Sequence, residues 1–129
     1  MHHRIAIMAA AVNVAFCLLT PVAGAQTMGD AQSGEKIYKR VCIGCHAIDS
    51  DEVKVGPSLK SVVNRQAGSV PGSSPALSQS NLSWTKETFD RYMENPTAVV
   101  PGTTMLLQIN DAKSRADLYA YLQTVSNKK

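Results

Sequence analysis

Aromatic side chains are scarce in this chain. Its 129 residues include two Phe, one Trp and four Tyr, so aromatic residues make up 5% of the composition. Aromatic rings usually dominate the buried area of a core, and a core built from this chain alone is therefore small. The shortage favours a domain that buries a large apolar cofactor.

A continuous apolar run long enough to cross a bilayer is also missing. The stretch Ile5–Leu19 spans 15 residues and is interrupted by Asn13, whereas a membrane helix needs roughly 20. It is followed by Ala23-Gly24-Ala25, a small-residue motif that suits signal peptidase. We therefore expect residues 1–25 to be a cleaved secretory signal peptide, and we expect no stable membrane anchor.

Cysteine occurs at three positions, and Cys17 falls within the predicted signal peptide. The remaining chain, residues 26–129, has the length of one domain and keeps Cys42 and Cys45. Because these two cysteines are neighbours in sequence, no disulfide can staple distant parts of the domain.

The charges argue against a nucleic-acid partner. Thirteen Lys and Arg stand against ten Asp and Glu, a formal net charge of +3 that falls to +2 when Arg4 leaves with the signal peptide. Both signs are spread along the chain, whereas a domain that binds nucleic acid has a basic patch or stripe. We expect no nucleic acid as a partner.

The two remaining cysteines belong to the string Cys42-Ile43-Gly44-Cys45-His46. This CxxCH pattern is the attachment signature of a c-type haem, because two thiols at this spacing can add to the vinyl groups on one edge of a porphyrin. Cys42 and Cys45 are then thioether anchors, and His46 is the proximal ligand of the iron. On the motif alone, a CxxC redox disulfide or half of a zinc site stays open as an alternative.

Hydrophobic spacing and capping residues predict helices and almost no strand. Asp30 has the position of an N-cap for an amphipathic helix that leads to Cys42, and a last helix begins at Asn110 or Asp111 and runs through Val125. Shorter helical segments are expected at 57–64, 75–80 and 85–95. The fold class is therefore all-α with long loops, which a covalent cofactor at the centre would hold together.

Gly34 lies inside the predicted first helix, where glycine costs about 1 kcal/mol relative to alanine. A common reason to accept this cost is the close approach of another backbone. The last helix is the best candidate, and crossing N- and C-terminal helices would close the domain.

A second ligand is needed to cover the iron face opposite His46. The string Pro101-Gly102-Thr103-Thr104-Met105 offers a thioether far enough along the chain to reach that face. Pro101 and Gly102 favour a tight turn that directs Met105 inward. Most methionines are core residues, and Met93, on the apolar face of the helix at 85–95, illustrates that alternative.

Together these features resemble the class I cytochrome c family, whose small members carry a single haem. The resemblance covers residues 26–129 and implies the class I cytochrome c fold, one covalent haem c and Met105 as the distal iron ligand. It is carried by Gly34, Tyr38, Cys42–His46, Gly56-Pro57-x-Leu59, Arg65, Trp84, Tyr92, Asn95-Pro96, Pro101-Gly102-Thr103-x-Met105 and Arg115–Leu122.

The resemblance also implies roles for residues around the iron ligands. A ligating imidazole usually donates its second N–H to a fixed acceptor, which for His46 is the carbonyl of Pro57. The indole N–H of Trp84 and the guanidinium of Arg65 are expected at a haem propionate. Tyr92 and Thr103 are expected to form hydrogen bonds around the Met105 sulfur.

Two departures from the family pattern qualify these expectations. Ser73-Ser74-Pro75 stands where many members have a tyrosine, so one propionate contact is missing or is made by Ser74. Thr97, Ala98 and Thr104 replace lysines that flank the methionine segment in the mitochondrial branch. The basic ring for docking acidic partners is therefore thin, and its remaining candidates are Lys36, Lys39, Lys54 and Lys60.

Haem iron with both His46 and Met105 as ligands is low-spin and coordinatively full, so its natural work is the transfer of one electron. We expect a monomeric periplasmic electron carrier, not an enzyme, that shuttles electrons between a redox protein donor and acceptor in respiration or a dehydrogenase system. The alternative is a haem c enzyme or sensor whose methionine leaves readily and exposes the iron to peroxide or a small gas.

Overall fold

The computed structural model describes residues 28–128, and the predicted signal peptide at 1–25, with Cys17, lies outside the described residues. Within that range no strand forms, and the one sheet-like feature is an isolated antiparallel bridge between Gln66 and Ser83. The all-α prediction is confirmed. The elements are α1 (Ala31–Ile37), the π-helix η1 (Tyr38–Cys42), α2 (Pro75–Gln79), α3 (Lys86–Glu94), α4 (Pro96–Val99) and α5 (Ala112–Ser126).

The first helix begins where its cap was predicted and changes character before the haem motif. The Asp30 carboxylate accepts hydrogen bonds from the backbone N–H groups of Gln32 and Ser33, at 3.1 and 3.3 Å. From Tyr38 the helix widens into η1, and the N–H of Ile43 donates to the carbonyl of Tyr38 at 3.0 Å. Such single π-turns are rare and often adjoin functional sites. The sequence pattern did not predict this one.

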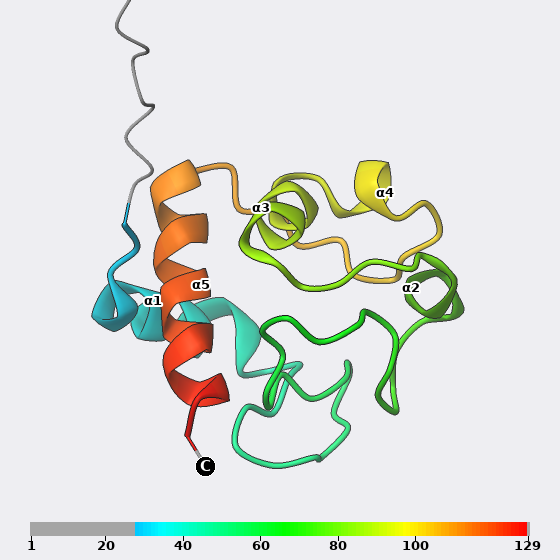
Figure 1. The fold of residues 1–129 in the computed structure, drawn as a ribbon, viewed down its shortest axis with the longest axis horizontal. Coiled ribbons are helices and arrows are strands. Elements are labelled where there is room, and N and C mark those ends of the chain that lie inside the picture. The colour runs from blue at the N-terminus through cyan, green and yellow to red at the C-terminus, as the bar shows by residue number, and fades with distance from the viewer. Residues whose placement is uncertain (1–27, 129) are drawn as a thin grey trace, which may run out of the picture.

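The terminal helices cross at the two glycines that precede and follow the cap. A Cβ built on Gly34 would lie 2.0 Å from the backbone oxygen of Asp117, and one built on Gly29 would lie 2.0 Å from that of Ala116. Both distances exclude any side chain. Figure 1 shows α1, in blue, passing across α5, in orange and red. The predicted crossing is confirmed, and it depends on backbone contact.

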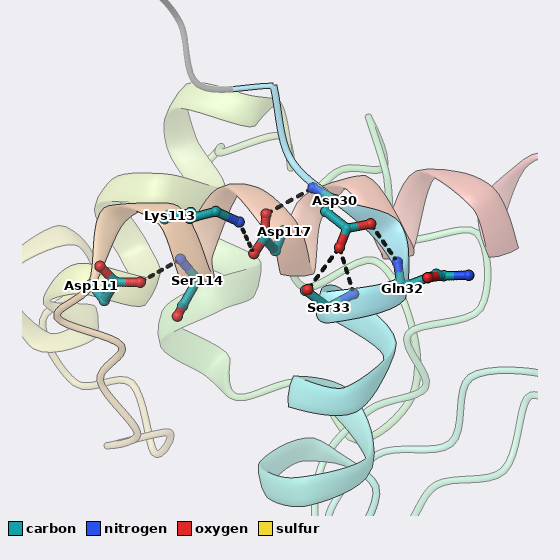
Figure 2. Close-up of polar contacts among 7 residues, drawn as sticks. All are labelled: Asp30, Gln32, Ser33, Asp111, Lys113, Ser114 and Asp117. Carbon is teal, nitrogen blue, oxygen red and sulfur yellow. Dashed lines mark hydrogen bonds and ion pairs between the residues drawn. The ribbon is translucent and has the colours of Figure 1, made fainter.

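A buried carboxylate ties the two helices together beside this contact (Figure 2). Asp117 accepts a hydrogen bond from the backbone N–H of Asp30 through Oδ1 and another from Lys113 Nζ through Oδ2, each at 2.7 Å. The Asp117 side chain is 6% exposed, so these donors offset the cost of burying its charge. Asp111 caps α5 by accepting from Ser114 N at 2.7 Å.

The short helices at 75–80 and 85–95 form as predicted. Ser74 caps α2, with Pro75 at the first position, and Thr85 caps α3. Helix α3 ends at Glu94 with Asn95 as its C-cap, as expected from the following proline. The chain then forms α4, since the Asn95 side chain accepts a hydrogen bond from Ala98 N at 3.2 Å and starts a new turn. This helix was not predicted.

The helix predicted at 57–64 is wrong. Ser61 and Asn64 adopt positive φ angles of 52° and 61°, which lie in the left-handed region and interrupt a helix. Instead this segment makes turns, and the Leu59 N–H bonds to the carbonyl of Ala47 at 2.9 Å. In this conformation the backbone carbonyls of Ser58 and Lys60 accept hydrogen bonds from the guanidinium of Arg65.

The buried core lies where α5 meets α1 and α3. Leu118 and Leu122 of α5 are 2% and 1% exposed. The rings of Phe89 in α3 and Tyr119 in α5 lie 5.3 Å apart between centroids. Over residues 28–128, no helix combines the length and apolar character required to cross a bilayer.

Gly34→Ala tests the helix crossing. Because the added methyl group would overlap the Asp117 carbonyl, the helices must separate, and overpacking of this kind typically costs about 1–3 kcal/mol. We expect the melting temperature of the protein to fall by several degrees. Gly44→Ala is the control, since no atom lies within 4 Å of its Cβ position. Equal melting temperatures for the two variants would contradict the crossing as the basis of stability.

Candidate functional site

One cavity of about 420 Å³ collects all nine candidate residues. This volume falls within the roughly 300–1,000 Å³ typical of cofactor pockets. The remaining wall is largely apolar and includes Leu77, Phe89, Leu118 and Leu122. The candidates that line it are Cys42, Cys45, His46, Pro57, Arg65, Trp84, Tyr92, Thr103 and Met105.

The imidazole of His46 is held in one orientation. Its Nδ1 lies 2.6 Å from the carbonyl oxygen of Pro57, and since a carbonyl can only accept, Nδ1 carries the hydrogen. In the neutral ring this leaves a lone pair on Nε2, the state that a metal ligand requires. Gly56 packs directly against the ring, because a Cβ there would lie 2.5 Å from His46 Cε1.

The backbone of the CxxCH motif is fixed by contacts that the sequence pattern did not predict. The Tyr38 hydroxyl donates to the carbonyl of His46 at 2.8 Å. Lys54 Nζ donates to the carbonyl of Ile43, and the Gly56 N–H donates to that of Cys45 at 2.9 Å. Tyr38 was named above only among the residues that carry the family resemblance. A hydroxyl on a helix face that is otherwise apolar and buried needs a hydrogen-bond partner, and this was the sequence feature that could have indicated the contact.

The Cys42 thiol does not suit a redox disulfide. Burial, with a smaller effect from nearby Cys45, raises the pKa of the Cys42 thiol to about 11. Reactive CxxC motifs instead lower a thiol pKa to form the nucleophilic thiolate. The redox-disulfide alternative is therefore disfavoured. Within residues 28–128, no group of three His, Cys, Asp or Glu is placed to hold a metal ion, whereas zinc sites use three or four such ligands.

Arg65 and Trp84 lie side by side because their backbones pair. The Trp84 N–H donates to the Arg65 carbonyl at 2.9 Å, and the Asn64 N–H donates to the Trp84 carbonyl at 3.1 Å. The Arg65 guanidinium bonds to two carbonyls, yet its Nε is buried and has no partner among the described residues. Burial lowers the Arg65 pKa. A half-buried guanidinium with a spare donor fits an anionic group of a cofactor.

Met105 lines the cavity together with Tyr92 and Thr103. The Tyr92 hydroxyl and Thr103 Oγ1 are 2.7 Å apart, so they bond to each other. Because one hydrogen bond uses one hydroxyl hydrogen, the pair retains a second for another acceptor. Burial raises the pKa of Tyr92, and the bond to Thr103 opposes this effect. Trp84 packs edge-on against Tyr92, with ring centroids 5.0 Å apart.

Ser74 also lines the cavity. Its Oγ accepts from Leu77 N at 3.3 Å as the cap of α2. The hydroxyl hydrogen is not used by this bond and remains for an acceptor inside the cavity.

Crossed terminal helices around an apolar cavity that contains a CxxCH motif define a single-haem protein of the class I type. Comparison with known proteins agrees. The family model described as "Cytochrome c" matches residues 31–126. Cytochrome c2 of Rhodomicrobium vannielii is 42% identical over 106 residues, which cover 79% of this chain and 84% of that protein.

Two further relatives extend the comparison. Cytochrome c type-1 of Ascaris suum is 39% identical over 98 residues, covering 74% of this chain and 88% of that protein. The solved structure of cytochrome cH from Methylobacterium extorquens superposes with a TM-score of 0.67 at 38% identity, covering 74% of this chain and 99% of that one.

The chain belongs to the cytochrome c family. It has the class I fold and carries one covalently attached haem c, for which Cys42 and Cys45 have the required spacing. It is an electron carrier and not an enzyme. Because the relatives come from both bacteria and eukaryotes, the family alone does not define the cellular compartment.

Gly56→Ala tests the packing behind the imidazole. The added methyl would overlap His46 Cε1, so the ring must turn or the loop must move. We expect a lower yield of stably loaded protein and displaced proton NMR signals of the His46 ring. Gly44→Ala again serves as the control. Unchanged His46 signals in Gly56→Ala would contradict this contact.

Proposed function

We propose that this protein is a periplasmic single-electron carrier whose low-spin haem iron is bound by His46 on one face and Met105 on the other. The observation that supports this best is that both side chains line the same cavity, although they come from opposite halves of the domain. When bound, the haem supplies an iron that gains or loses one electron.

The protein's contribution on the proximal side is orientation. Pro57 accepts the Nδ1 hydrogen of His46, which fixes the tautomer and increases the basicity of Nε2. Gly56 leaves room for the ring, and Tyr38 holds the backbone of His46. A ligand fixed in this way moves little between oxidation states, which suits rapid electron transfer.

On the distal side, methionine favours the reduced iron more than a second histidine would. The hydroxyl pair of Tyr92 and Thr103 adjoins Met105 in the cavity wall, and its spare hydrogen can donate to the sulfur. The Arg65 guanidinium and the Trp84 indole N–H serve a propionate, where the spare Nε of Arg65 helps to neutralise the negative charge.

The compartment follows from the leader. Residues 1–25 act as a cleaved signal peptide that exports the cytochrome c domain, residues 26–129, to the periplasm. The bacterial cytochrome c2 relatives support a bacterial setting. There the monomeric protein exchanges electrons with a redox protein donor and acceptor.

The rim of the cavity favours partners that dock with little electrostatic attraction. Val55 and Leu106, 82% and 71% exposed, lie at this rim. Of the four candidate docking lysines, two are paired with acids: Lys39 with Glu35 at 2.7 Å and Lys60 with Asp51 at 3.0 Å, while Lys54 donates to the neutral Ile43 carbonyl and keeps its charge. The attractive field for an acidic partner is therefore weak.

The ligand assignment predicts different effects for the two axial positions. His46→Ala should prevent formation of stable loaded protein, because the attachment motif loses its iron ligand. Met105→Ala should keep the haem attached but lower the reduction potential and admit carbon monoxide or cyanide to the iron. The measurements are haem content, redox titration and ligand binding by absorbance. Equal loss of haem in both variants would show that the roles are misassigned, and rapid cyanide binding by the unaltered protein would favour the labile-methionine alternative.

The weak field predicts a shallow salt dependence. Because exposed charges farther apart than about 8 Å are screened at 0.15 M salt, strong electrostatic docking would slow steeply as salt rises. We expect the rate at which membranes of the source organism reduce this protein to change little as the salt concentration is raised to 0.15 M. Thr104→Lys, which adds a cation at the exposed rim, should steepen the dependence with an acidic partner. A steep fall for the unaltered protein would contradict an apolar docking surface.

A further inference from the structure

The segment that carries Met105, residues 103–110 and here called the methionine arm, has few bonds of its own. From Met105 to Asn110 the backbone forms no helix or strand. Outside helices, the backbone–backbone hydrogen bond described for this stretch is that from the Ile109 N–H to the Met93 carbonyl, at 2.7 Å. The hydrogen bonds that hold the arm therefore lie mainly at its two ends, while Met105, Leu107 and Ile109 pack against the buried core.

The upstream end is fixed at Thr103. Its N–H donates to the Val100 carbonyl at 3.1 Å, and its hydroxyl bonds to that of Tyr92 at 2.7 Å. Thr103 and Tyr92 are both buried. This end adjoins helix α3, which carries Tyr92.

The downstream end is fixed by Arg115, from the first turns of α5. Its Nη1 donates to the carbonyls of Ile109 and Asn110, each at 2.9 Å. Nε of the same side chain donates to Asp90 Oδ1 at 2.7 Å, and Nη2 to Oδ2 at 3.4 Å. Asp90 belongs to α3, so one guanidinium connects α5, α3 and the arm.

The negative charge of Asp90 offsets the free-energy cost of burying the Arg115 guanidinium. The Arg115 side chain is 6% exposed, and a buried cation is costly unless it is paired. Glu94 Oε1, at 3.8 Å from Nη2, is the more distant acid. Without the Asp90 charge, the guanidinium gains by turning towards water, and the two arm carbonyls then lose their donor.

We propose that Arg115 and Asp90 are positioning residues that hold the downstream end of the methionine arm and thereby keep Met105 on the iron. This inference rests on the proposed His46 and Met105 ligation. It predicts that weakening the pair makes Met105 easier to displace, beyond any general loss of stability.

The test compares two Asp→Asn variants of the haem-loaded protein. Asp90→Asn weakens the Arg115 pair, whereas Asp117→Asn weakens the clamp between α1 and α5, away from the arm (Figure 2). Imidazole is titrated into the oxidised proteins at fixed pH, and its binding constant is measured. The intensity of the sulfur-to-iron charge-transfer band and the melting temperature are recorded for each protein. We expect Asp90→Asn to bind imidazole about five- to tenfold more tightly than the unaltered protein, and Asp117→Asn to bind it unchanged while melting lower.

Arg115→Lys is the second variant, in case Asp90→Asn yields too little loaded protein. A lysine can pair with Asp90 but cannot also reach both carbonyls with a planar fork, so imidazole affinity should again rise. If either Arg115 or Asp90 variant binds imidazole no more tightly than Asp117→Asn, the positioning role is overturned while the ligand assignment stands. If the unaltered protein lacks the charge-transfer band and binds imidazole as Met105→Ala does, the ligand assignment itself fails, and the positioning role fails with it.

Discussion

The backbone contact between α1 and α5 is the constraint on which the other parts of the domain depend. Gly34 and Gly29 let the two helices touch at the carbonyls of Asp117 and Ala116, and no bulkier residue would permit this. The contact places η1 and Cys42 beside the α5 side chains Leu118 and Leu122, which form part of the cavity wall. Since few aromatic residues are available for the core, the covalent haem of this family supplies apolar contacts that the chain cannot make alone.

Features encoded over a few residues could be predicted from the sequence. The cap of α1 was predicted at Asp30, and it is local, because the carboxylate bonds to backbone N–H groups two and three positions ahead. The attachment motif is local as well. The nine candidate residues were predicted from the attachment motif together with the family resemblance, and all nine line the cavity. Gly34 was informative because its cost in a helix requires a compensating contact.

Features that depend on distant neighbours could not be predicted. The turns at 57–64 replace a helix because Ser61 and Asn64 adopt positive φ, and the carbonyls so arranged serve Arg65, outside the segment. The bond from Tyr38 to the His46 carbonyl requires the turn of the attachment motif, and the pairing of Arg115 with Asp90 requires α3 to lie against α5. Spacing reports which face of a helix is apolar. It does not report which polar atom of another element that face meets.

The two sides of the proposed iron site are built in different ways, and this difference has a mechanical consequence. His46 belongs to the attachment motif itself, and its contacts with Tyr38 and Pro57 come from residues within eleven positions of it. Met105 lies on an arm whose anchors are Tyr92, Met93 and, through Arg115, Asp90. All three lie on α3, which packs against α5 through Phe89 and Tyr119. A displacement of α3 would therefore move both ends of the arm together, so the strength of the distal bond depends on how firmly α5 holds α3.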